Sequence, residues 1–142
     1  MAEVWKNIKG YEGLYQVSNL GNVKSLRKRI DKGKCHRYFN EKILKPIETN
    51  NGYLRVKLCR DRKIEKIRVH RLVAEAFIKK PELEVNHIDG NKKNNRIENL
   101  EWVTKKENLQ HAWKNGLHPK KRRKKYKWIE MTLKIINTIK YG

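Results

Sequence analysis

One stretch in the middle of the chain, residues 85–108, restricts the local fold more than any other. It reads VNHIDGNKKNNRIENLEWVTKKEN and contains six asparagines, one histidine and one tryptophan. Asparagine side chains compete with their own backbone for hydrogen bonds, so this residue type favours turns, caps and polar loops. EVNHI before the polar residues and LEWV after the polar residues carry spaced apolar side chains. The stretch therefore predicts a strand, a polar loop and a second strand.

A helix is predicted directly after the second strand. Thr104 is followed three residues later by Glu107, which is the pattern of a capping box. Gly116 is placed to end the helix. The local architecture is thus strand, loop, strand, helix. The apolar face of the helix comprises Leu109, Ala112 and Trp113.

The first half of the chain predicts an antiparallel, β-rich structure. Short strands flank a tight turn at residues 19–22, and Asn51-Gly52 is a strong hairpin signal. After this hairpin, apolar residues alternate with basic and aromatic ones, so that one sheet face is apolar and the other basic. RLVAEAFIKKP predicts a short helix that ends before Pro81. The alternating apolar residues are Leu54, Val56, Leu58, Ile67 and Val69.

The charge of the chain points to a polyanionic partner. Lys and Arg number 36 against 15 Asp and Glu, which gives a net charge of +21. Nucleic acid is the first candidate for such a partner, although a basic sheet face can also be an ordinary solvated surface. Six consecutive cations, Lys120–Lys125, predict an interaction arm, and a final helix is predicted after them. The candidate DNA contacts are Lys24, Arg27, Arg29, Arg55, Lys57, Arg68, Lys120, Lys121, Arg122 and Arg123.

Other partners and compartments are weaker hypotheses. No apolar run approaches the ~20 residues that a spanning helix needs. The first residues lack the apolar core of a signal peptide, so we expect a cytoplasmic protein with no membrane or small-molecule partner. Membrane-surface binding by KKRRKKYKWIEMTLKII is an alternative for the C-terminal segment. Cys35 and Cys59 form no CxxC pair, and we expect both to be reduced, structural thiols.

The single histidine of the central stretch is a candidate for hydrolytic chemistry. His87 ends the first predicted strand, and Asn108 lies in the first turn of the predicted helix. An imidazole and an amide oxygen across a small cleft can position a water beside a divalent cation, which phosphodiester hydrolysis requires. A lone histidine beside a turn is more often a structural hydrogen-bonding group, and this alternative stays open on the residues alone.

Two motifs resemble those of a known family. VNHIDGNKKNNRIENLEWVTKKEN, preceded by VHRLVAEAF, resembles the HNH endonucleases of the phage and intron-encoded homing type. WKNIKGYEGLYQVSNLGNVKSL is similar to the N-terminal module that accompanies such nuclease domains. The resemblance covers Val4 to Gly116 and implies an α+β fold, with an N-terminal antiparallel β module, a ββα-metal nuclease motif and a basic C-terminal helical tail. The corresponding domains are a DNA-binding module over 1–66, an HNH domain over 67–116 and a basic arm and helix over 117–142.

The resemblance also implies roles for individual residues. His87 matches the general base, Asn99 matches the asparagine that ties the polar loop together and so orients the histidine, and Asn108 matches a metal ligand. Asn86 stands where the family often has an aspartate as second ligand. An amide oxygen can coordinate Mg²⁺ but brings no charge, so we expect weaker binding. The implied cofactor is Mg²⁺, for which Mn²⁺ or another divalent cation can substitute.

Auxiliary roles are open for three further residues. Asp89 could assist the metal through water, although a role in the Asp-Gly turn is the more ordinary one. His70 could contact the phosphate or brace the site, and His111 is an alternative metal ligand or DNA contact. We expect Trp102 to fill the core beneath the hairpin.

The function implied by the resemblance is a metal-dependent homing-type endonuclease that nicks or cleaves double-stranded DNA. We expect a monomer or weak homodimer in the cytoplasm of a bacterial host, encoded by a phage or intron. A catalytically inert, basic nucleic-acid-binding protein is the alternative. About 17 residues follow the basic run, which are too few for the helix-turn-helix with which homing relatives often end.

Overall fold

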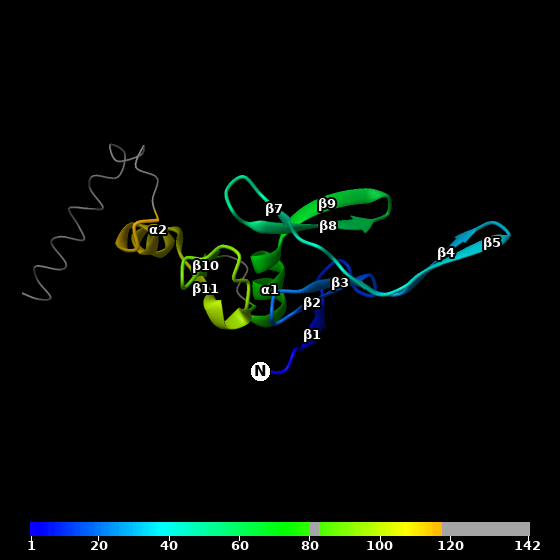
Figure 1. The fold of residues 1–142 in the computed structure, drawn as a ribbon, viewed down its shortest axis with the longest axis horizontal. Helices are drawn as coiled ribbons and strands as arrows, with labels where there is room; N and C mark the ends of the chain where they lie inside the picture. The colour runs from blue at the N-terminus through cyan, green and yellow to red at the C-terminus, as the bar shows by residue number, and fades with distance from the viewer. Residues whose placement is uncertain (80–82, 118–142) are drawn as a thin grey trace, which may run out of the picture. The chain divides into compact units, whose positions relative to one another are not determined.

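The computed structural model describes residues 1–79 and 83–117. Residues 1–102 form one compact unit, and the second unit begins at Val103. The predicted basic arm and final helix lie outside the described residues. In order, the first unit contains a four-stranded sheet, a separate two-stranded ribbon, a three-stranded sheet, a helix and a final strand pair (Figure 1).

The four-stranded sheet has the order β1-β2-β3-β6 and is antiparallel throughout. The turn predicted at residues 19–22 joins β2 to β3. Its register pairs Val17 with Val23, and both side chains are buried. The strands are β1 Trp5–Asn7, β2 Tyr15–Ser18, β3 Val23–Ser25 and β6 Lys42–Ile43.

Between β3 and β6 the chain forms an exposed ribbon that the sequence analysis does not predict. Strand β4, Lys28–Lys32, pairs with β5, Cys35–Phe39, and all ten residues except Lys28 are exposed (Figure 1). Cys35 lies on this ribbon, and Cys59 is also exposed. Both thiols are free, as expected, but neither is packed in a core.

The hairpin predicted at Asn51-Gly52 joins β7, Ile47–Glu48, to β8, Leu54–Arg60. Strand β8 then pairs with β9, Lys63–Arg68. The predicted alternation is present in β8, where Val56 and Leu58 are buried and Lys57 is exposed.

Helix α1, Val69–Phe77, follows β9 without a loop, so Val69 is the first helical residue and not, as predicted, a strand residue. The side chains of Val69, Leu72 and Val73 are buried on the helix face that meets the core. Because helical spacing brings these three apolar residues onto one face, the helical conformation buries more apolar surface than a continued strand. The core joins both sheets, α1 and Leu100, which follows the polar loop.

The predicted strand, loop, strand and helix are all present. Strand β10, Glu84–His87, pairs with β11, Leu100–Val103, and a short 3₁₀ helix, Ile97–Asn99, precedes β11. In the second unit, α2, Lys105–Lys114, begins with the predicted capping box. In this box, Thr104 Oγ1 accepts from the Glu107 backbone N–H at 3.2 Å, and Glu107 Oε2 accepts from the Thr104 backbone N–H at 2.8 Å.

Candidate active site

His87 ends β10 and is held by one asparagine of the polar loop. His87 Nε2 lies 3.0 Å from Asn95 Oδ1, and the two residues are each only 4% exposed. Because an amide oxygen only accepts hydrogen bonds, Nε2 carries the proton in this arrangement, and Nδ1 is left as the basic nitrogen. The contact thus selects the tautomer and fixes the ring.

The His87 ring packs against a second histidine and a tyrosine. The ring centroids of His87 and His70 are 5.0 Å apart in a T-shaped arrangement, and Tyr53 lies 6.0 Å from His87 and 5.1 Å from His70. The cations of Arg68 and Lys92 lie 4.7 and 4.8 Å from the Tyr53 ring centroid. These ring contacts bury the imidazole.

Burial keeps both histidines neutral. Removal from water lowers the pKa of His87, although the bond to Asn95 and the charge of Asp89 oppose this shift. Burial, together with the neighbouring His87, lowers the pKa of His70 to about 3. Near neutral pH, His87 is therefore in the form that can accept a proton. His70 Nδ1 is buried without a hydrogen-bond partner, which fits a packing role better than a phosphate contact.

The polar loop is closed by Asp89 and Asn99. Asp89 Oδ1 accepts from the Asn91 backbone N–H at 2.7 Å and from Asn99 Nδ2 at 2.8 Å, and Asp89 Oδ2 accepts from Asn94 Nδ2 at 2.9 Å. Asn99 Oδ1 in turn accepts from the Asp89 backbone N–H at 3.0 Å. These bonds, the one from Asn94 first, lower the pKa of Asp89. Asn99 thus ties the loop together, while the direct contact to His87 comes from Asn95.

The N-terminal sheet supports this loop through its β2–β3 turn. The Ile97 backbone N–H donates to the Asn19 carbonyl at 2.9 Å. Gly21 has a φ of +88°, and a Cβ at this position would lie 3.0 Å from the Asn95 Cβ and backbone oxygen. The glycine therefore allows the turn to press directly against the residue that holds His87.

Asn86, which precedes His87 on β10, is the candidate oxygen donor for a divalent cation in the first unit. Asn86 is 7% exposed, and its Nδ2 donates to Glu101 Oε1 on β11 at 2.8 Å. Residues 1–79 and 83–117 contain no group of three His, Cys, Asp or Glu side chains that could hold a metal ion. Few protein ligands can still suit Mg²⁺, because this ion keeps several water ligands and also binds phosphate oxygens of the substrate. The Asn86 amide oxygen and the Glu101 carboxylate are therefore oxygen donors of the kind that Mg²⁺ accepts.

Two candidates, Asn108 and His111, belong to the second unit. Asn108 is the fourth residue of α2, and its backbone N–H donates to the Thr104 carbonyl at 2.9 Å. His111 lies in the last turn of the same helix, where its carbonyl accepts from Asn115 Nδ2 at 2.9 Å. Asn108 and His111 are thus one turn apart on a helix whose start is firmly capped.

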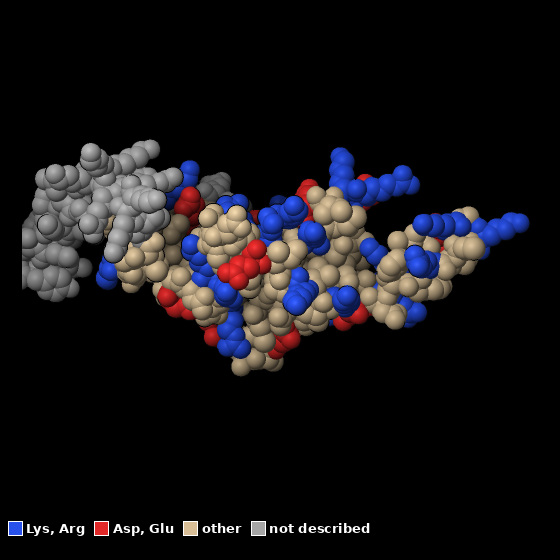
Figure 2. Space-filling model, turned by 45° about the horizontal axis from the view of Figure 1, so that its top comes forward, with Lys and Arg blue, Asp and Glu red and all other residues tan. Residues whose placement is uncertain are grey.

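The basic residues of β8 and β9 face one another directly. The register pairs Arg55 with Arg68 and Lys57 with Lys66, so like charges are adjacent on one sheet face. Such pairs destabilise an isolated sheet. Lysine and arginine side chains are spread more widely than acidic ones on the face shown in Figure 2.

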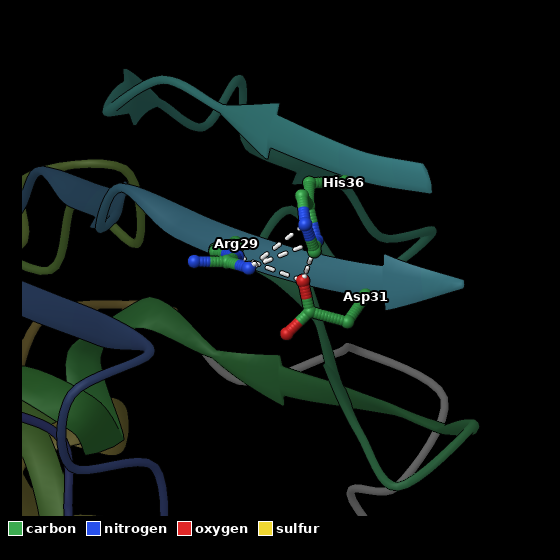
Figure 3. Close-up of polar contacts among 3 residues, drawn as sticks. All are labelled: Arg29, Asp31 and His36. Atoms are coloured by element: carbon green, nitrogen blue, oxygen red, sulfur yellow. Dashed lines mark hydrogen bonds and ion pairs between the residues drawn. The ribbon is translucent and has the colours of Figure 1, made fainter. Parts of the chain in front are cut away.

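The other DNA-contact candidates are dispersed. Lys24 forms an ion pair with Glu41 at 3.1 Å and lies 4.4 Å from the Trp5 ring centroid. Arg29 is on the ribbon, where Nε donates to Asp31 Oδ1 at 2.7 Å and Nη2 lies 2.9 Å from His36 Nδ1 (Figure 3).

Arg27 lies 5.6 Å from a ribbon tyrosine ring, that of Tyr38. Lys120, Lys121, Arg122 and Arg123 lie outside the described residues.

No helix of the described residues is long and apolar enough to cross a membrane. Trp102 is half-buried, with its Nε1 buried and unpaired.

Comparison with known proteins decides the family. Residues 68–110 match the profile of the HNH endonuclease family, and residues 3–59 match that of the NUMOD4 motif. The chain belongs to the HNH homing endonucleases. It is 43% identical over 114 residues to the DNA endonuclease I-HmuI of Bacillus phage SP01. The aligned region covers 79% of this chain and 59% of I-HmuI.

Two further likenesses agree with this family. An uncharacterized HNH endonuclease of Acanthamoeba polyphaga mimivirus is 42% identical over 123 residues, covering 82% of this chain and 27% of the relative. A solved structure that describes DNA binding and cleavage by the HNH homing endonuclease I-HmuI matches this chain with a TM-score of 0.67 and 42% identity. The match covers 87% of this chain and 66% of that one. The predicted α+β fold with an HNH motif is confirmed. The chain spans less than two thirds of the length of these relatives.

Sequence reasoning missed three residues of the HNH site. Asn95 is one of six asparagines in the stretch, and residue type alone does not distinguish it from its neighbours. Tyr53 is far from His87 in sequence, so local patterns could not place their rings together. Glu101 had a usable signal, since β-strand alternation predicts that Asn86 and Glu101 can share one face of the β10–β11 pair.

Proposed function

We propose that this HNH homing endonuclease nicks or cleaves double-stranded DNA in a divalent-metal-dependent reaction, with His87 as general base. The observation that carries the proposal is the His87–Asn95 contact at 3.0 Å in a buried setting. A neutral imidazole with a fixed tautomer is what a base needs near neutral pH. The family implies a divalent metal, and we propose Mg²⁺, with Mn²⁺ as a substitute.

His87 Nδ1 would take a proton from a water that attacks the scissile phosphorus. As the new P–O bond forms, the bond to the 3′ oxygen breaks, leaving 5′-phosphate and 3′-hydroxyl ends. A bound cation would offset charge on the phosphate and on the leaving oxygen. Asn86 and, by the family motif, Asn108 are the proposed ligands, and Asn99 holds the loop in shape. The ring is only 4% exposed, so bulk water is largely excluded from the base.

The basic face of β8 and β9 would bind the DNA backbone. Its cross-strand pairs of like charge are unfavourable without a polyanion, and Arg68 continues this face to Tyr53, whose ring packs near His87. Phosphates along the face would relieve the repulsion and lead the backbone toward the histidine. Arg27, Arg29 and Lys24 are further proposed contacts.

In this proposal, different parts of the chain have different functions. Residues 1–66 would bind DNA, 67–116 would form the nuclease domain, and 117–142 would add a basic arm. The two family profiles, which meet between residues 59 and 68, support this division. We propose action as a monomer or weak homodimer in the cytoplasm of a bacterial host.

A non-catalytic DNA-binding protein is the second candidate. Asn86 is uncharged, and the described residues offer no cluster of acidic and histidine ligands. Both observations favour weak metal binding. This alternative predicts salt-sensitive DNA binding without any cleavage.

Supercoiled plasmid distinguishes the two candidates. We expect conversion to open-circular or linear DNA with Mg²⁺ or Mn²⁺, none with EDTA, and 5′-phosphate with 3′-hydroxyl ends on mapping. DNA binding at full occupancy without strand breaks in either metal would instead establish the inert binder.

A further inference from the structure

Asn86 lacks the charge that a carboxylate ligand would bring, but it contacts a carboxylate on the next strand. Asn86 Nδ2 donates to Glu101 Oε1 at 2.8 Å, and the Asn86 side chain is 7% exposed. This inference rests on the proposed metal-dependent function. A neutral amide can coordinate a cation more strongly when a carboxylate orients and polarises it.

The geometry points to Glu101 as the residue that both orients the Asn86 amide for the cation and supplies the missing negative charge. Because Glu101 Oε1 accepts from Nδ2, the amide is fixed with its Oδ1 directed away from Glu101. A charge-assisted hydrogen bond is stronger than a neutral one, and it increases the electron density on the amide oxygen. Glu101 is a positioning residue, acting on the cation through Asn86.

The strand pair explains why Glu101 and not another acidic residue fills this role. The Ile88 backbone N–H donates to the Asn99 carbonyl at 2.9 Å, which fixes the loop end of the β10–β11 pair. Asn86 and Glu101 then lie two residues further along their strands, on one face of the hairpin. Glu98, in the 3₁₀ helix, is exposed and makes no hydrogen bond or ion pair with the described residues.

The test is Mn²⁺ binding to the full chain, measured from free Mn²⁺ by electron paramagnetic resonance, with and without duplex DNA. Glu101→Gln keeps the size of the side chain and an acceptor oxygen for Asn86, and so removes mainly the charge. We expect Mn²⁺ affinity to fall about 10- to 100-fold, as it does when outer-shell partners of metal ligands are replaced. Glu98→Gln makes the same charge change elsewhere and should bind as wild type.

The decisive variant is Asn86→Asp combined with Glu101→Gln. If Glu101 compensates for the neutral ligand, a carboxylate at residue 86 restores Mn²⁺ affinity to within a few-fold of wild type. Loss in Glu101→Gln without this rescue would show a merely structural role and overturn the inference. Unchanged affinity in Glu101→Gln, with wild type binding, would overturn the inference and leave the proposed nuclease intact. Absence of saturable binding in wild type would overturn both.

Discussion

At the scale of single residues, the active site depends on how one imidazole is held. Asn95 selects the tautomer of His87, and packing against His70 and Tyr53 keeps the ring out of water. Burial favours the neutral base over the imidazolium, whereas the bond to Asn95 opposes this shift in the pKa and fixes which ring nitrogen carries the proton. In the proposed mechanism, the competence of His87 as a base thus depends on the side chains that hold and bury its ring.

Asn95→Ala should remove the fixed tautomer while leaving His87 in place. We expect the single-turnover cleavage rate to fall about 100-fold, the typical cost of a misplaced catalytic group. DNA affinity, measured by filter binding, should change little. Asn91→Ala serves as the control. Asn91 is an exposed loop residue, and among the described residues its side chain accepts only from the Lys93 backbone N–H at 3.1 Å. Equal rate losses in both variants would count against the role of Asn95.

His70 should make folding stability depend on pH. Its pKa is about 3 in the folded protein against an ordinary 6.5, so the unfolded chain binds more protons between these values. Stability is therefore full above pH 6.5 and falls as pH decreases toward 3, by up to about 1.4 kcal/mol per pH unit from this group. Urea unfolding from pH 7 to 4 should show a shallower decline for His70→Gln. A wild-type slope in His70→Gln would contradict the burial argument.

At the scale of elements, the predictions that succeeded had local signals. Asn51-Gly52 predicted its hairpin and Thr104 with Glu107 predicted the start of α2, because turn and cap preferences act within a few residues. The β4–β5 ribbon was missed because its ten residues bury almost nothing and so lack a pattern set by a core. The packing of Tyr53 against His87, and of the β2–β3 turn against Asn95, joins residues far apart in sequence and so could not be predicted from local patterns.

The β8–β9 pair carries an element-scale prediction. Lys57→Glu places an acid opposite Lys66 and should stabilise the fold by about 0.2–1 kcal/mol in urea unfolding. The same change should weaken DNA binding and lower the slope of log K against log salt by about 1–2, because one cation is lost and one anion is added. Lys45→Glu reverses an exposed charge outside both strands. If Lys45→Glu reduced the salt slope as much, the β8–β9 face would not be the DNA surface.

At the scale of the whole molecule, the N-terminal sheet packs directly against the region that contains His87. The core joins residues on both sides of position 66, and the β2–β3 turn touches the loop that holds His87. The NUMOD4 region therefore packs against the HNH region in this fold, in addition to the DNA-binding role that we propose for it.

Gly21→Ala tests that link. The added Cβ would meet Asn95 at 3.0 Å, and the φ of +88° is strained for alanine, so we expect lower stability and slower cleavage. Gly13→Ala is a matched control, because Gly13 has a φ of +74° but nothing within 4 Å of the new Cβ. Both variants should lose about 1–2 kcal/mol of stability from the backbone alone. Only Gly21→Ala should also slow cleavage at saturating DNA, and equal cleavage rates in the two variants would break the proposed link.

The most direct test of the account is the single-turnover cleavage rate of His87→Ala on saturating plasmid with Mg²⁺ or Mn²⁺. We predict a loss of at least about 100-fold, the low end of the contribution of a general base, with DNA affinity unchanged. Cleavage by His87→Ala at the wild-type rate would show that His87 is not the base.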